Sequence, residues 1–423
     1  MSEPKPRLFT PYQVFMIAVL SFIQFTVILD FMVLSPLGAL LLPQLQITTA
    51  QFGFVVSAYA FSAVITGLLA AGFADRFDRK RFLLFFYAGF IIGTVLCGIA
   101  TTYRFLLFAR IITGVFGGVI GSVGFAIMTD LFRIEVRGRV MGFMQMSFAA
   151  SQILGLPIGL FLANRFGWHA PFWMIAILGF LVGLLIMYKM EPVTEHLTVQ
   201  KRVNAFQHLK ATITKRFYQR AFISTVLLAT GGFMLMPFGS AYSTNNLGIK
   251  MDQLPLVYLV TGVCSIVAGP LIGKLTDQVG RFKVFLMGTV LAIALVGLYT
   301  NLNGPIHLWV LIVINVILFV GITARMISAS TLISTIPAPH DRGAFMSINS
   351  SIQQISGGVA SFIAGLIVIQ TSDGKLSRYP LLGLVVILSM LIALSLIYWL
   401  DNYLKQHSQE PELNQHTLIK KNI

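Results

Sequence analysis

A single carboxylate stands inside an apolar stretch near the start of the chain. Residues 27–36 read VILDFMVLSP, and Asp30 is their one charged side chain. Placing an acid within a membrane span costs about 2.5–3.5 kcal/mol, so an acid found there is expected to have a function. Of the 15 acids, Asp30 is the only one that we place well inside an apolar stretch, and we place no histidine there. If a side chain carries protons through this protein, Asp30 is nearly the only candidate.

Arg110 is predicted to meet Asp30. Asp30 lies six residues before Pro36, near the end of its stretch, and Arg110 lies six residues from the start of its own. At 1.5 Å per residue, both would sit on the order of 9 Å below the same membrane face. An arginine that pairs with the acid only in some conformations would let it load and release a proton. A permanent structural pair, or a direct contact between Asp30 and a cationic substrate, stays open as an alternative.

Arg325 is the other buried charge, and no buried acid is left to pair with it. It could attract an anionic substrate from a central cavity or bond to carbonyls at a span end, and Asn349, Gln353 or Gln354 could be its polar partner. Each polar side chain could instead hold two helices together, and the apolar ones could face core or lipid. The residues expected to line a substrate cavity are Gln24, Asp30, Gln145, Gln152, Phe233, Met234, Arg325, Asn349 and Gln353.

The composition predicts a protein that crosses the membrane many times. The chain has 423 residues, of which 56% are hydrophobic and 11% are charged, whereas globular domains carry about 25% charged residues. Apolar stretches of 18 or more residues recur, enough to cross about 30 Å of hydrocarbon. The first stretch is expected to be a retained span, since no signal peptidase site precedes it. The lipid bilayer is therefore a necessary partner.

The chemistry of soluble enzymes has no support in this sequence. Cys97 and Cys264 both lie in apolar stretches and are expected to be inert packing thiols. There is no cluster with metal-ligand spacing, no phosphate-binding glycine loop with its lysine, and no nucleophile elbow. We therefore expect neither an enzyme nor a bound cofactor or metal.

Reading the apolar stretches as helices predicts an all-α membrane protein with twelve spans. Their ranges are 12–40, 51–73, 82–101, 104–128, 139–163, 170–190, 218–243, 253–275, 282–300, 306–334, 343–370 and 379–401. With both termini in the cytoplasm, most of the 30 lysines and arginines fall on the cytoplasmic side. The ones outside are Arg104, Arg165, Lys250, Lys375 and Arg378. The distribution of the basic residues behind the net charge of +15 therefore indicates the orientation of the chain in the membrane, and does not indicate nucleic-acid binding.

Two loops repeat at the same spacing in the two parts of the chain. Residues 71–81 read AGFADRFDRKR and residues 273–283 read GKLTDQVGRFK, with their acids and arginines 202 positions apart. A second echo, RGRVMG at 137–142 and RGAFMS at 342–347, is offset by 205. Matching loops after matching spans indicate duplication. Duplication predicts two pseudo-symmetric six-helix halves with a cavity at their interface.

The predicted organisation follows from this repeat. The hydrophilic linker has apolar residues at near-helical spacing, as in an amphipathic helix on the cytoplasmic membrane face. The tail is short and polar and is expected to be disordered. The parts are the N-terminal half 1–190, the linker 191–216, the C-terminal half 217–401 and the cytoplasmic tail 402–423.

The chain resembles the major facilitator superfamily over essentially its whole length. The repeated loops are similar to that family's G-x-L-a-D-r-x-G-r-k motif, although Ala71 and Asp78 replace the two glycines of the first copy. Span four contains LLFARIITGVFGG (106–118), similar to the R-x-x-q-G element, with Thr113 in place of glutamine. A loop acid that accepts hydrogen bonds from a helix N-terminus and from arginine would latch the two halves in one state; alternatively, the loop's basic run is only a positive-inside signal. The latch residues are Asp75, Arg76, Arg79, Lys80, Asp277 and Arg281.

Span five refines the resemblance. Residues 151–172 read SQILGLPIGLFLANRFGWHAPF, in which Gly155, Pro157 and Gly159 are similar to the helix-kinking pattern of drug/proton antiporters. Ser151 replaces the first glycine of that pattern and Leu156 separates Gly155 from Pro157. The GxPxG…GW…F form is closer to the arabinose-efflux-like permeases.

The resemblance implies a secondary transporter. We expect a monomer that exports a small amphiphilic or apolar organic compound in exchange for protons. Two alternatives stay open: an exporter of a sugar or other polar solute, and a non-transporting receptor or assembly partner on the same fold. The substrate itself is chosen by the shape of the cavity, which no motif encodes.

Overall fold

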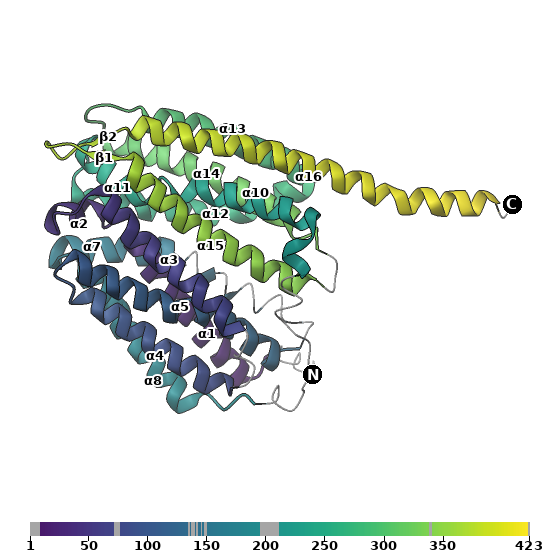
Figure 1. Cartoon of the computed structure of the whole chain (residues 1–423), viewed down its shortest axis with the longest axis horizontal. Coiled ribbons are helices and arrows are strands. Elements are labelled where there is room, and N and C mark those ends of the chain that lie inside the picture. Colours follow the sequence, from purple (N-terminus) through teal and green to yellow (C-terminus); the bar gives the residue numbers. More distant parts are fainter. Residues whose placement is uncertain are drawn as a thin grey trace, which may run out of the picture.

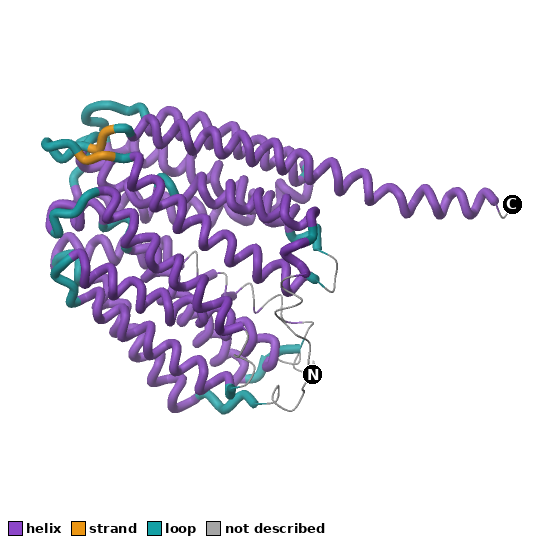
Figure 2. The backbone as a smooth tube through the Cα atoms, viewed as in Figure 1, coloured by secondary structure: helices purple, strands orange, loops and turns teal. Residues whose placement is uncertain are grey.

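The structure, a computed structural model, describes residues 9–71, 77–133, 136, 140, 143–144, 146–147, 150–194, 211–337 and 341–421. Long helices run back and forth between two ends of the molecule (Figure 1). Figure 2 shows two short strands, β1 (Ile369–Gln370) and β2 (Leu376–Ser377), at one of these ends. We call this the hairpin end, and the end where α1 begins the termini end.

The helices form two groups that follow one another in the chain. The first half contains α1 (Pro11–Val33), α2 (Gly38–Gln44), α3 (Thr49–Ala71), α4 (Arg79–Gly98), α5 (Tyr103–Leu131), the π-helical turn η2 (Ser151–Gly155), α7 (Leu156–Phe166) and α8 (Ala170–Lys189). The second half contains α10 (Arg216–Phe233), α11 (Met236–Asn245), the 3₁₀ turn η4 (Met251–Gln253), α12 (Leu254–Val279), α13 (Arg281–Thr300), α14 (Leu308–Ile333), α15 (Arg342–Ile367) and α16 (Tyr379–Lys421).

The expected membrane fold of two six-helix halves is confirmed. Among the described residues, ten helical segments are long and apolar enough to cross a membrane. The fifth expected span corresponds to η2 and α7 with the residues before them, and the eleventh corresponds to the more polar α15. The spans predicted from apolar stretches therefore match helices along the chain, and most of the described ends differ by a few residues.

Capping residues explain where several helices begin. The Thr10 hydroxyl accepts a hydrogen bond from the backbone N–H of Gln13, the side-chain oxygen of Gln13 accepts one from the backbone N–H of Thr10, and Pro11 fits the first turn. Asp78 caps α4 through the backbone N–H of Lys80. The equivalent position in the second half is Gly280, whose φ of 104° permits the turn between α12 and α13. The two copies of the loop thus reach the same helix start by different means.

Span seven is interrupted. α10 ends at Phe233 and α11 begins at Met236, so two residues separate them. Pro237 lacks a backbone N–H and therefore cannot continue the ladder of α10. Span one is also divided, into α1 and α2, with Pro36 in the turn between them.

The tail differs from the expectation. α16 continues as one helix to Lys421, whereas residues 402–423 were predicted to be disordered (Figure 1). Glutamine, leucine, lysine and glutamate dominate this stretch, and all of them favour helix. Lys405 also pairs with Asp401 one turn earlier. Residues 195–210, most of the expected amphipathic linker, lie outside the described residues.

The two halves meet at the hairpin end and in the middle of the bundle. The Thr49 hydroxyl donates to the carbonyl of Val368, and the Asn164 amide donates to the carbonyl of Met251. Further along α3 and α15, a Cβ on Gly358 would lie 2.9 Å from Cβ of Ala60. Figure 1 shows the ribbons of the two halves diverging from there toward the termini end.

Candidate functional site

The predicted contact between Asp30 and Arg110 is confirmed. Nη1 of Arg110 donates to Oδ2 of Asp30 at 2.7 Å and lies 3.3 Å from the backbone carbonyl of the same residue. Both side chains are 0% exposed. Asp30 comes from α1 and Arg110 from α5, and Thr94 of α4 donates to the other carboxylate oxygen at 3.2 Å. Three helices therefore supply one buried ionic site in the first half.

Only Nη1 of the three guanidinium nitrogens of Arg110 has a hydrogen-bond partner among the described residues. Its Nε and Nη2 atoms are buried and have no hydrogen-bond partner among the described residues. The ring of Tyr59 lies 4.8 Å from its Cζ, which adds a cation–π contact. A buried ion pair stabilises a fold only when its geometry is excellent and its other donors are bonded. A pair that holds its acid through one nitrogen can change partners at less cost than a full bidentate pair.

Aromatic side chains connect this pair to the second half. Phe31, next to Asp30, lies 5.3 Å from the ring of Tyr59 and 6.0 Å from the ring of Phe233. Phe233 ends α10, where span seven is interrupted. A movement of Asp30 is therefore transmitted to the second half through the packed rings of Phe31 and Phe233.

Span five packs directly against the helix that carries Asp30. A Cβ on Gly155 would lie 2.5 Å from Leu29, and one on Gly159 would lie 3.0 Å from Val33. Pro157 follows the π-helical turn η2 at the start of α7. These small or ring-constrained residues allow the close approach of span five to α1.

The other expected cavity residues fall into separate places. Asn349 accepts a hydrogen bond from Thr225, and Arg325 donates to Thr289 of α13, so the partner expected from span eleven is not the one observed. Thr289 is the observed partner because its helix, α13, packs directly against α14, the helix that carries Arg325. Met234 is buried and Phe233 is half-buried. Three further glutamines (Gln24, Gln152 and Gln353) are half-buried on α1, η2 and α15, while Gln145 lies outside the described residues.

The described latch residues make bonds within their own half. Arg79 at the start of α4 donates to Asp130 near the end of α5 at 3.1 Å, and Arg281 at the start of α13 lies 3.4 Å from Thr335 after α14. Lys80 donates to the carbonyl of Met187. The remaining predicted latch residues are Asp277, which is exposed, and Asp75 and Arg76, which lie outside the described residues.

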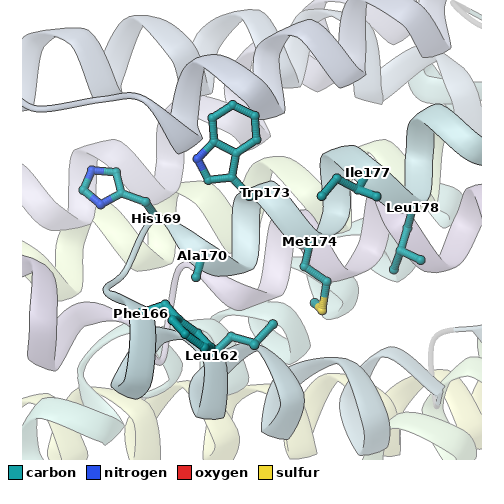
Figure 3. Close-up of a pocket in the computed structure, with 8 residues that line it drawn as sticks. All are labelled: Leu162, Phe166, His169, Ala170, Trp173, Met174, Ile177 and Leu178. Atoms are coloured by element: carbon teal, nitrogen blue, oxygen red, sulfur yellow. The ribbon is translucent and has the colours of Figure 1, made fainter.

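A shallow apolar cavity of about 570 Å³ lies between α7 and α8, away from the ion pair (Figure 3). Phe166, Trp173 and Ile177 on its wall are 41–69% exposed, as expected for a surface that faces lipid. His169 at its edge bonds to the carbonyl of Ala100. The lining residues are Leu162, Phe166, His169, Ala170, Trp173, Met174, Ile177 and Leu178. We assign this cavity to the lipid-facing surface.

Sequence reasoning missed Thr94, Tyr59 and Asp130. Hydroxyl side chains are common in spans and usually bond to the preceding turn, as Thr94 also does to Phe90, so the sequence does not single one out. Asp130 had a usable signal. It stands 205 positions before Thr335, the offset of the second loop echo, and each of the two accepts the bond of a repeated arginine.

Two duplicated six-helix halves, the first of which encloses a buried acid–arginine pair, define the architecture of a secondary membrane transporter. The chain belongs to the Major Facilitator Superfamily, which matches residues 20–220 and 221–421.

Relatives and solved structures agree with this assignment. An uncharacterized MFS-type transporter of Bacillus subtilis, YceJ, is 30% identical over 276 residues, which are 64% of this chain and 70% of the relative. Multidrug resistance protein 3 of the same organism is 35% identical over 147 residues, 34% of this chain and 28% of that protein. A bacterial homolog of the human lysosomal transporter Spinster, in an inward-facing and occupied conformation, shares the fold with a TM-score of 0.73 at 15% identity; the match covers 93% of this chain and 98% of that chain.

Proposed function

We propose that this transporter exports a small amphiphilic or apolar organic compound in exchange for protons, by alternating access. The observation that carries the proposal is the buried pair of Asp30 and Arg110, whose nitrogen and oxygen lie 2.7 Å apart. An ionisable pair inside a membrane protein is expensive and typically marks an ion or proton pathway. The incomplete bonding of Arg110 supports a pair that opens during the cycle.

Asp30 is the proton carrier in this proposal, and Arg110 sets when it is charged. A proton on Oδ2 removes the negative charge that holds Nη1 of Arg110, so the contact between α1 and α5 loosens. Phe31 moves with Asp30 and changes its contact with Phe233 in the second half. Protonation thereby favours a different arrangement of the two halves.

The orientation is part of the proposal. We assign the termini end to the cytoplasm, because the basic residues gather there and the positive-inside rule then holds. The membrane is the inner membrane of a bacterial-type cell. The described contacts between the halves lie at the hairpin end and in the middle of the bundle, so we assign this arrangement as the one open to the cytoplasm. One chain supplies both halves of the interface, which supports a monomer divided into 1–190, 191–216, 217–401 and 402–423.

Export of organic compounds is supported by one relative. The name of Multidrug resistance protein 3 describes resistance to several drugs, and that protein is 35% identical over about a third of this chain. Phe31, Tyr59 and Phe233 meet where the halves join, and such aromatic surfaces accept apolar parts of ligands.

Proton movement in reconstituted vesicles tests the proposal. An imposed pH gradient is monitored by an enclosed pH dye while lipophilic cations, neutral drugs, carboxylates and sugars are added one at a time. We expect at least one amphiphilic compound to cause proton flux in the wild type, and Asp30→Asn to reduce this flux to the level of protein-free vesicles. Asp252→Asn, which alters an exposed acid at the hairpin end, is the matched control and should keep it.

The outcome separates the alternatives. Flux that survives Asp30→Asn would show that Asp30 is structural. Flux caused by sugars alone would favour the exporter of polar solutes. If no compound causes flux or crosses the membrane, a non-transporting protein on this fold becomes the better description.

A further inference from the structure

Arg325 is a buried cation whose bonding is incomplete. Its side chain lies within the second half and is 2% exposed. Nε donates to the hydroxyl of Thr289 at 3.2 Å, and Cζ lies 5.7 Å from the centre of the Phe285 ring. Nη2 has no hydrogen-bond partner among the described residues. A guanidinium has five N–H donors, so one neutral acceptor leaves most of the desolvation cost uncompensated.

The surroundings of Arg325 use the same residue types as the first-half ion pair, without an acid among the described residues. In the first half, α1, α4 and α5 supply Asp30, Thr94 and Arg110. The corresponding helices of the second half are α10, α13 and α14. Of these, α14 supplies Arg325 and α13 supplies Thr289, at other positions along their helices than Arg110 and Thr94 have. On the side of α10, Arg325 meets glycine.

The sequence register marks the same part of α10. Asp30, Phe31 and Met32 are followed 202 positions later by Gly232, Phe233 and Met234, and the loop acids show the same spacing. The rings of Phe31 and Phe233 lie 6.0 Å apart, as expected for equivalent residues beside a pseudo-two-fold axis. Gly232 corresponds to Asp30 in the sequence, and its neighbour Gly231 is the glycine beside Arg325.

The space beside this glycine pair is suited to a small anionic group. A Cβ on Gly231 would lie 3.4 Å from Nη1 of Arg325, so a group at this distance from α10 reaches the guanidinium. A Cβ on Gly232 would meet no atom within 4 Å. Met390 flanks Gly231 and offers an apolar wall.

We propose that Arg325, with Thr289 and the Gly231–Gly232 stretch, binds the carboxylate of an amphiphilic organic acid that the protein transports. The inference rests on the proposed transport function and names the class of substrate. The carboxylate lies beside Gly231 and accepts hydrogen bonds from the guanidinium N–H groups of Arg325 that have no other acceptor among the described residues. Met390 and Phe285 contact the apolar part of the solute.

Thermal unfolding of the purified full-length chain in detergent tests this site without any transport step. Salicylate is the probe, and salicylamide is its neutral analogue. We expect salicylate, but not salicylamide, to raise the Tm of the wild type. Arg325→Gln should raise the half-saturating salicylate concentration by about tenfold or more, because a charged hydrogen bond is lost.

Two further substitutions sharpen the test. Gly231→Asp brings a fixed carboxylate next to Arg325, so it should raise the Tm without ligand and abolish the response to salicylate. Gly183→Ala in α8 of the first half, whose Cβ would meet its nearest neighbour at 3.8 Å, is the control and should keep the response.

The proposal is overturned if salicylate does not stabilise the wild type, or if Arg325→Gln or Gly231→Asp responds as Gly183→Ala does. Asp30→Asn should retain the salicylate shift. Failure of proton coupling at Asp30 and failure of the anion site are therefore distinguished by different measurements.

Discussion

Asp30 and Arg110 are both fully buried, so each neutralises the other inside the first half. Removing one partner of such a pair leaves an uncompensated charge, whereas removing both does not. If Arg110 is removed, Thr94 alone remains to stabilise the carboxylate of Asp30. The stability of single and double variants therefore reports whether the pair is closed in the resting protein.

Arg110→Met is expected to lower the free energy of unfolding by about 3–5 kcal/mol at neutral pH, because it leaves the buried carboxylate unpaired. The double variant Asp30→Leu/Arg110→Met should lie much closer to the wild type. Thermal unfolding of the purified proteins in one detergent measures both. A double variant that is as unstable as Arg110→Met would contradict a closed pair.

The sequence alone predicted this contact, because the depth of each residue follows from its distance to the end of its span. It did not predict the partner of Arg325. Depth was not sufficient there, since the choice between Thr289 and Asn349 depends on how each helix is rotated about its axis. The side-chain oxygen of Asn349 instead accepts a hydrogen bond from the hydroxyl of Thr225.

Among the helices, α3 and α5 approach each other closely through glycines of span four. A Cβ on Gly118 would lie 2.1 Å from the carbonyl oxygen of Ala63, and one on Gly114 would lie 2.1 Å from the Ser62 hydroxyl. These two glycines are four residues apart and face the same helix. Small residues at this spacing let membrane helices pack backbone to backbone.

Gly118→Ala should therefore destabilise the protein by about 1–3 kcal/mol, because the added methyl group overpacks the contact with α3. Gly183→Ala in α8 is the matched control, since its Cβ would meet its nearest neighbour, Ile91, at 3.8 Å. The control should be neutral or slightly stabilising. Thermal unfolding of both variants, measured side by side, checks the difference. Equal stability of the two would refute the close packing of α3 on α5.

Helices were the most predictable elements, because an apolar stretch of sufficient length has few alternatives in a membrane. The division of span seven follows from Gly231, Gly232 and Pro237, which interrupt the helical hydrogen bonds. The π-helical turn η2 has no distinct residue pattern. The hairpin of β1 and β2 had a usable signal in Asp373-Gly374, with a φ of 81° at Gly374, but the apolar stretches on both sides drew attention away from it. The hairpin is held by Asn246, whose side chain bonds to the backbone N–H and carbonyl of Leu376.

In the whole molecule, the contacts between the halves are concentrated where α3 meets α15 and where α12 meets span five. A Cβ on Gly262 of α12 would lie 3.4 Å from Cβ of Ile153 in η2. Disulfides form at Cβ separations of about 3.5–4.5 Å, so cysteines at these positions are close enough to be joined. Transport by alternating access requires these surfaces to separate during each cycle.

A cross-link between Ile153→Cys and Gly262→Cys should therefore stop transport, and reduction should restore it. The background carries Cys97→Ala and Cys264→Ser, so that no native thiol competes. Each single cysteine variant is the control and should transport equally well under oxidising and reducing conditions. Substrate flux in vesicles gives the readout, with cross-linking followed by gel mobility after cleavage between the halves. A fully cross-linked protein that still transports would show that the halves do not separate at α12 and η2. Transport would then have to proceed by a more local movement than the rocking of one half against the other.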